Sequence, residues 1–221
     1  MNATTVDPTD FVRTVKPVLE RKDLPGLLAL LKSRWTAGQI VSLLGCGCCD
    51  ARKVAALSLS LVGGCWCLCE LARQLKDPDP MVNQMAEHAM WSIWFRGGTD
   101  EANHQVCRGA KAIDRGDCEH AITHFDKAIH LCPDFPEAYN QRALAQYLLE
   151  RYEQSIADCR KAVELMPIHF GAWAGMGHCH ANQGRISQAL ECYEKALSIN
   201  PHMGQIREAV GELRLRIGAD V

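Results

Sequence analysis

Small and apolar residues recur along the second half of the chain at the spacing of one face of an α-helix. Between residues 121 and 129 the steps are three and four positions, at Ala121, Ile122, Phe125, Ala128 and Ile129. This spacing predicts amphipathic helices that bury one face. Strand-like alternation of any length is missing from the sequence, so we expect an all-α protein.

A second amphipathic pattern follows Pro201. Apolar residues share one face there, at Ile206, Val210, Leu213 and Ile217, and charged residues occupy the others. The pattern predicts a C-terminal helix that covers an apolar surface with one face and meets solvent with the rest.

The helical pattern of the second half repeats at a constant period. Pro133, Pro167 and Pro201 mark the period, and each proline ends a unit because it cannot continue a helix. Small or aromatic side chains return in the same register, at Gly109, Ala143 and Gly177, at Ala121, Ser155 and Ala189, and at Phe125, Cys159 and Tyr193. Gly116 and Gly184 stand where the two helices of a unit must turn sharply.

This pattern resembles the tetratricopeptide-repeat (TPR) superfamily. The resemblance implies three helix-pair units, at 102–135, 136–169 and 170–203, followed by a capping helix to residue 221. It also implies a right-handed solenoid of helical hairpins that binds a protein or peptide, with the first helix of each unit lining the concave face. Carried over by register, the groove residues are Asn103, Val106, Ala110, Asp114, Glu137, Asn140, Leu144, Tyr147, Ala174, His178, Ala181 and Asn182. Members that clamp acidic chaperone tails carry Lys and Arg in slots that Val106, Ala110, Gly171 and Gly175 fill here, so we do not expect such tails to bind.

The first half follows a different and shorter offset. It aligns Trp35 with Trp66, Ile40 with Leu71 and Leu44 with Leu75. The run Asp50, Arg52, Val54, Ala55 and Ala56 resembles the entry of a HEAT repeat, although Asn83 replaces an arginine that this family often carries. We therefore expect HEAT-like helical repeats over residues 1–98, ahead of the TPR units.

The charge balance argues against nucleic acid as a partner. The chain has 24 Lys and Arg against 26 Asp and Glu, a net charge of −2, and no run of like charges along the sequence. The first thirty residues contain too many charges for a signal peptide, and the most apolar stretch, residues 55–68, is too short to cross a bilayer. Together with twelve cysteines and no export signal, this predicts a cytoplasmic protein with reduced thiols and no membrane association.

Two cysteine clusters suggest an alternative function. Cys46, Cys48 and Cys49 form one cluster, and Cys65, Cys67 and Cys69 form the other. A thiol-based redox sensor or a metal-binding regulator would use such groups. A helix between the clusters would hold them roughly 20 Å apart, and each alone offers only three thiols. We therefore expect no metal and treat the cysteines as small hydrophobes at helix ends and on the apolar face.

No motif in the sequence indicates an enzyme. There is no glycine-rich phosphate loop after a strand and no nucleophile elbow. His120 and His124 lie four residues apart without the carboxylate of a zincin motif. The sequence therefore favours a non-enzymatic adaptor or scaffold that needs no cofactor.

Overall fold

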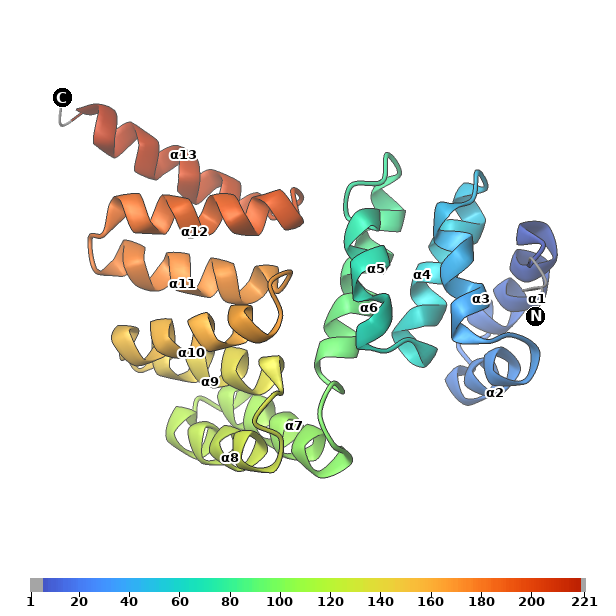
Figure 1. Ribbon diagram of the computed structural model, residues 1–221, viewed down its shortest axis with the longest axis horizontal. Coiled ribbons are helices and arrows are strands. Elements are labelled where there is room, and N and C mark those ends of the chain that lie inside the picture. The colour runs from blue at the N-terminus through green and yellow to red at the C-terminus, as the bar shows by residue number, and fades with distance from the viewer. Residues whose placement is uncertain (1–5, 220–221) are drawn as a thin grey trace. The chain divides into compact units, whose positions relative to one another are not determined.

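The computed structural model describes residues 6–219 of the chain, with side chains described up to residue 216. Within this range the secondary structure is thirteen α-helices and two short 3₁₀ helices, which confirms the expected all-α class. The chain divides after Trp94 into two compact units, which we describe separately (Figure 1). No helix within the described range is both long and apolar enough to span a membrane.

The N-terminal unit is built from three helix pairs. Its elements are α1 (Pro8–Glu20), α2 (Leu24–Arg34), α3 (Ala37–Ser42), η1 (Leu43–Gly45), α4 (Cys49–Val62), η2 (Cys65–Cys67), α5 (Leu68–Gln74) and α6 (Pro80–Trp94). Helices α1 and α2, α3 and α4, and α5 and α6 pack as pairs. The starts of α3 and α5, at Ala37 and Leu68, are separated by the same offset as the starts of α4 and α6, at Cys49 and Pro80. This is the offset seen in the sequence.

The same offset also relates positions in the core of this unit. Ile40 and Leu71 are both fully buried, and Leu44 and Leu75 are buried likewise. Trp35 and Trp66 do not correspond, because Trp35 packs edge-on against Phe11 while Trp66 is 60% exposed.

A half-buried ion pair joins two hairpins at the start of α4. Arg52 donates from Nε and Nη2 to both oxygens of Asp77, at 2.7 and 3.1 Å. Asn83 instead donates to the backbone carbonyls of Gln74 and Asp77, and so closes the turn before α6. The HEAT-like assignment of residues 1–98 stays a prediction.

The C-terminal unit is a stack of helix pairs (Figure 1). Its helices are α7 (Asp100–Asp114), α8 (Cys118–Leu131), α9 (Pro136–Leu148), α10 (Tyr152–Leu165), α11 (Phe170–Asn182), α12 (Ile186–Ile199) and α13 (Gly204–Ala219). Each expected repeat unit contains one pair, α7 with α8, α9 with α10, and α11 with α12, and α13 packs against α12. The exact boundaries of the repeat units stay predictions.

The turns inside the pairs need a left-handed residue. Gly116 has φ of +77° and Gly184 has φ of +72°, as the sequence predicted. Glu150 occupies the same register in the middle unit with φ of +58°. Only glycine adopts this conformation without steric cost, so the middle turn is the strained one.

A small residue in the first helix lets the two helices of a pair approach closely. A Cβ at Gly109 would lie 2.4 Å from the ring of Phe125, and one at Gly177 would lie 2.4 Å from the ring of Tyr193. Both distances are far below van der Waals contact. The aromatic ring of the second helix therefore rests directly on the backbone of the first.

Ion pairs related by the repeat period connect successive units. Glu119 of α8 pairs with Arg151, and Glu153 of α10 pairs with Arg185. These pairs are exposed, so each contributes little to stability, about 0–1 kcal/mol. They show that the units dock in one common register.

Helix α13 covers the apolar surface of the last pair. Its inner face carries Ile206, Val210 and Leu213, which are 4, 7 and 6% exposed. Ile217, the fourth residue expected on this face, lies outside the described side chains. The described part thus agrees with a capping helix.

We expect deletion of residues 204–221 to destabilise the C-terminal unit and to promote aggregation. The three buried side chains stabilise by about 1.5–3 kcal/mol each, and their loss would expose the apolar surface of α12. Thermal unfolding and light scattering of the truncated protein measure the effect. A truncated protein that stays monodisperse and melts at an unchanged temperature would contradict it.

Candidate peptide-binding groove

The first helices of the three pairs form the inner face of the C-terminal unit. Helix α7 contacts α9, and α9 contacts α11. In the described part of the chain, no contact of similar extent joins α8 with α10 or α10 with α12. Closer spacing of the first helices makes their common face the concave one, where an extended ligand would meet side chains from several units.

Helix α9 carries two exposed leucines at positions that the repeat register assigns to this face. Leu144 is 42% exposed and Leu148 is 49% exposed, one helical turn apart. Leu148 was not among the groove residues predicted from the sequence, although its spacing of four from Leu144 places it on the same side. Exposed leucines at adjacent turns offer a surface that excludes water when another apolar side chain covers it.

Polar groups beside these leucines are held in fixed orientations. Asn182 Nδ2 donates to the Tyr147 hydroxyl oxygen at 3.1 Å and to the His178 carbonyl at 2.9 Å. The Asn182 carbonyl oxygen and the Tyr147 hydroxyl hydrogen are left to pair with a ligand. Tyr147 belongs to α9 and Asn182 to α11, two successive repeat units, so the alignment of the two side chains depends on how these helices pack.

His178 is held by the second helix of its own pair. Its Nδ1 lies 2.8 Å from the Tyr193 hydroxyl. Burial lowers the pKa of His178 and raises that of Tyr193, so both are neutral at pH 7. The ring of Tyr147 lies 6.2 Å from that of His178 and 5.8 Å from that of Tyr152. Tyr147 is therefore partly packed, and truncating it would disturb more than a ligand contact.

Three of the predicted groove residues are buried, and their assignment as ligand contacts is wrong. Val106 is fully buried in the core between α7 and α8, and Ala174 is 5% exposed. Glu137 is fully buried as well. The register correctly placed them on first helices, but neighbouring helices cover their side chains.

Glu137 belongs to a buried hydrogen-bonded cluster instead. Its carboxylate accepts from His169 Nε2 at 2.8 Å and from Gln141 Nε2 at 2.6 Å. His169 Nδ1 in turn accepts from the Ala172 backbone N–H at 3.1 Å, which caps the start of α11. Because Nδ1 accepts, the ring proton is on Nε2 and points at Glu137. The cluster ties the second unit to the third.

The remaining predicted groove residues differ in what they can offer. The side-chain amide of Asn103 is already hydrogen-bonded to the backbone of Gly98. Its Nδ2 donates to the Gly98 carbonyl, and its Oδ1 accepts from the Gly98 N–H. Asp114 is exposed and Ala110 is half-buried on α7, as Ala181 is on α11. Asn140 is half-buried and has only long contacts of 3.4 Å to Glu137. As ligand contacts, these residues stay predictions.

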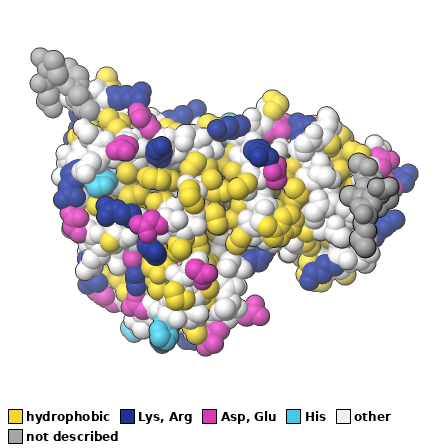
Figure 2. Space-filling model, in the orientation of Figure 1, with side chains coloured by type: hydrophobic (Ala, Val, Ile, Leu, Met, Phe, Trp, Pro, Cys, Tyr) yellow, Lys and Arg dark blue, Asp and Glu magenta, His cyan; other side chains and the backbone are white. Residues whose placement is uncertain are grey.

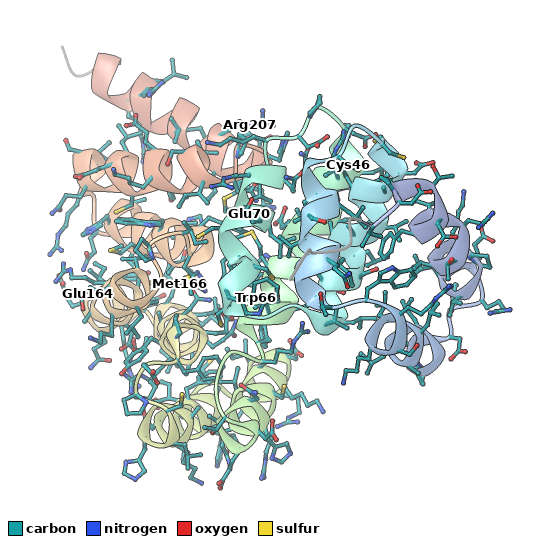
Figure 3. All side chains as sticks on the ribbon, turned by 45° about the vertical axis from the view of Figure 1, so that its right-hand side comes forward. Cys46, Trp66, Glu70, Glu164, Met166 and Arg207 are labelled. Carbon is teal, nitrogen blue, oxygen red and sulfur yellow. The ribbon has the colours of Figure 1, made fainter. Side chains whose placement is uncertain are left out.

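The N-terminal cysteines are more exposed than the sequence suggested. Cys67 is buried, but Cys48, Cys65 and Cys69 are exposed, so the expectation that they fill the apolar face is wrong for these three. Figure 3 shows Cys46 and Trp66 well apart in the N-terminal unit, which agrees with α4 separating the clusters. No three His, Cys, Asp or Glu side chains in the described residues are arranged to hold a metal ion.

Cys49 is the thiol of these clusters that is hydrogen-bonded to a carboxylate. It donates to Asp79 Oδ2 at 2.8 Å, and Asp79 also pairs with Lys53 at 2.9 Å. The hydrogen bond to Asp79 raises the pKa of Cys49, mainly because the carboxylate disfavours a thiolate. This environment is unlike that of a reactive cysteine, whose pKa is lowered.

Comparison with known families agrees with the helix pairs described above. A family model described as "Tetratricopeptide repeat" matches residues 136–169 and 171–203, and one described as "TPR repeat" matches residues 111–150. Residues 111–203 are tetratricopeptide repeats. The TPR part therefore begins in α7 and ends just after α12.

Similar proteins share this part of the chain. A TPR repeat-containing protein of Rhizobium etli is 29% identical over 152 residues, covering 68% of this chain and 74% of the relative. The Hsp70-Hsp90 organizing protein of Triticum aestivum is 33% identical over 100 residues, but these are 45% of this chain and only 17% of that protein. Several matched relatives are thus much longer proteins that contain a similar segment.

Solved structures show the same fold. The first TPR of Spaghetti (RPAP3), solved with the HSP90 peptide SRMEEVD, superposes with a TM-score of 0.54 at 21% identity, covering 55% of this chain and 98% of that one. MamA superposes with a TM-score of 0.51 at 20% identity, covering 62% of this chain and 84% of that one. At such identities the likeness establishes the TPR fold and nothing about ligands.

We expect Glu137→Ala to reduce stability by roughly 2–4 kcal/mol, because it leaves His169 Nε2 and Gln141 Nε2 buried without an acceptor. Urea unfolding measures the loss. The matched control is Leu144→Ala on the same helix, which removes an exposed side chain and should change stability by about 0.5 kcal/mol or less. Equal effects of the two substitutions would show that Glu137 is not a structural residue.

We also expect the purified protein to bind no stoichiometric zinc or iron, because the cysteine clusters lie at opposite ends of α4 and each lacks a fourth ligand. Elemental analysis tests this directly. About one metal ion per chain, lost on substitution of Cys46 or Cys65, would contradict it.

Proposed function

We propose that this chain is a protein-interaction adaptor whose TPR part holds an extended peptide or protein segment on its concave face. The TPR fold itself supports a role in protein binding, since it presents several parallel helices along one continuous surface. The sequence offers no catalytic motif that would favour a competing function. The cysteine-based alternative gains no support, because no three His, Cys, Asp or Glu side chains in the described residues are arranged to hold a metal ion and the pKa of the Cys49 thiol is raised.

The observation that carries the proposal is the exposed pair Leu144 and Leu148, which the repeat register assigns to the inner face together with the hydrogen-bonded Tyr147 and Asn182. The leucines would contribute affinity by burying apolar area, and the amide of Asn182 with the hydroxyl of Tyr147 would orient the ligand backbone. Among the described groove residues that a ligand can reach, Asp114 alone carries a charge. The groove therefore suits a segment with apolar side chains and no excess of negative charge.

This chemistry separates the proposed ligand from acidic chaperone tails. A tail that ends in carboxylates needs cations on the inner face, and the corresponding slots hold Val106, Ala110, Gly171 and Gly175. Val106 is also buried and cannot be reached. We therefore propose that the ligand is a neutral, apolar segment.

Peptides selected from a random phage-displayed library on the purified protein provide the test. We expect selected peptides to carry apolar side chains and to lose at least about tenfold in affinity, roughly 1.4 kcal/mol, on the double substitution Leu144→Ala and Leu148→Ala. Calorimetry measures the affinity. Both leucines are exposed, so circular dichroism should show unchanged helix content.

The matched control removes two exposed leucines elsewhere, by Leu131→Ala on α8 and Leu215→Ala on α13. It should leave binding unchanged, and the peptide SRMEEVD should not bind either variant or the original protein. Selected peptides that bind all variants equally, or strong binding of SRMEEVD, would show that the concave face does not act as proposed.

A further inference from the structure

The outer face of α7 carries a stripe of basic residues that no other described residue of the C-terminal unit neutralises. His104, Arg108, Lys111 and Arg115 follow one another at steps of four, three and four, so they lie on one side of the helix. All four are exposed, and none has a hydrogen bond or ion pair through its side chain within the described residues. From His104 to Arg115 the stripe extends about 16 Å along the helix axis.

The repeat register identifies what this face does in the other two units. Its counterparts in α9 are Ala138, Arg142, Ala145 and Leu149, and in α11 they are Ala172, Met176, Cys179 and Gln183. Ala138 and Ala145 are fully buried in the core they share with α8, and Ala172 and Cys179 are buried in the core they share with α10. This face of a first helix is thus the one that receives the second helix of the preceding unit.

Arg142 shows which partner an arginine takes at this position. It donates to Asp158 of its own unit at 2.6 and 2.7 Å and to Asp126 of the preceding unit at 2.6 Å. The two carboxylates raise the pKa of Arg142 still further and hold three helices together. At this position Arg142 therefore binds one carboxylate of the helix that docks on the face, Asp126, and one of its own pair, Asp158.

Arg108 has the register of Arg142 but neither of its partners. His124 stands where Asp158 would be, and its Nδ1 lies 2.8 Å from Gln105 Oε1. Burial and the positive charge of Arg108 both lower the pKa of His124. The acids of α8 are engaged elsewhere, since Glu119 pairs with Arg151 and Asp126 with Arg142.

The exposed acids of α7 lie at its two ends, Asp100 and Glu101 one turn before His104 and Asp114 beside Arg115, so on this face the stretch from Arg108 to Arg115 carries cations alone. Helix α13, at the other end of the array, exposes side chains of both positive and negative charge. These are Arg207, Glu208, Glu212, Arg214 and Arg216. Figure 2 likewise shows Lys and Arg side chains lying among Asp and Glu side chains over the C-terminal unit, at the left of the view. Mixed signs give solubility without repulsion between neighbours, whereas a uniform stripe costs repulsion unless an opposite charge covers it.

We propose that the outer face of α7 is a docking site for an acidic amphipathic helix of another protein, which packs there as α8 packs on α9. One carboxylate of the incoming helix pairs with Arg108 as Asp126 pairs with Arg142, and others meet Lys111 and Arg115. Arginine favours carboxylates through its planar, bidentate donors. This surface is separate from the concave groove and does not depend on the function proposed for it.

Two blocked peptide helices of about 20 residues, built on alanine and glutamine, probe the site. One carries glutamates at positions i, i+4, i+7 and i+11, and its twin carries lysines there. Fluorescence anisotropy at low salt should show binding of the glutamate helix only, weakened by added salt. The triple substitution Arg108→Glu, Lys111→Glu and Arg115→Glu should reduce affinity at least about tenfold, and the glutamine triple should reduce it less.

The matched control reverses three exposed cations on second helices, by Arg160→Glu, Lys161→Glu and Lys195→Glu, and should keep binding within about twofold. The Leu144→Ala, Leu148→Ala protein should also keep it, which separates this site from the groove. Equal binding of the lysine twin, or equal loss in the control triple, would overturn the proposal. Binding of phosphatidylserine vesicles or duplex DNA through the stripe, without binding of the glutamate helix, would overturn it as well.

Discussion

The close approach of paired helices is the constraint on which the C-terminal unit depends. Phe125 and Tyr193 lie on the backbones of α7 and α11 only because Gly109 and Gly177 have no side chain. The contact brings a full aromatic face out of water and fixes the distance between the helices of a pair. Once that distance is fixed, the next pair can dock in one register only, and every later surface follows from it.

That register explains why the same kind of residue has different roles in different units. Arg142 and Arg108 are one repeat period apart and occupy the same place on a first helix, yet one is half-buried between two carboxylates and the other is exposed. The difference is in what precedes them, because α9 follows a second helix of the array and α7 does not. In a solenoid, position in the stack decides burial as much as sequence does.

The sequence predicted the parts of the fold that local geometry determines. The prolines, the small residues and the turn glycines each follow from steric rules, so helix pairs and turns could be inferred from spacing alone. Exposure in the groove could not be inferred, because it depends on residues far apart in sequence. Glu137 lies on a first helix as expected, but it is fully buried and hydrogen-bonded to His169, which lies 32 residues further along the chain and caps the start of α11. The cysteines and the basic stripe show the same limit. Spacing correctly separated the cysteine clusters without revealing that Cys65 and Cys69 are exposed. The stripe on α7 contains no run of like charges and is visible only when the helical period is applied to residues 104–115.

The two proposed surfaces differ in the chemistry they select, and this bears on what an adaptor of this size could do. The concave face offers leucines and uncharged polar groups, so its affinity would depend little on salt. The outer face of α7 offers unpaired cations, so its affinity would fall with salt and its association would be fast at low ionic strength. Because the leucines of the groove come from α9 and the cations from α7, ligands could occupy both without sharing a side chain. A chain with this division would hold two dissimilar partners at once, which is the physical requirement for an adaptor rather than for a single-ligand receptor.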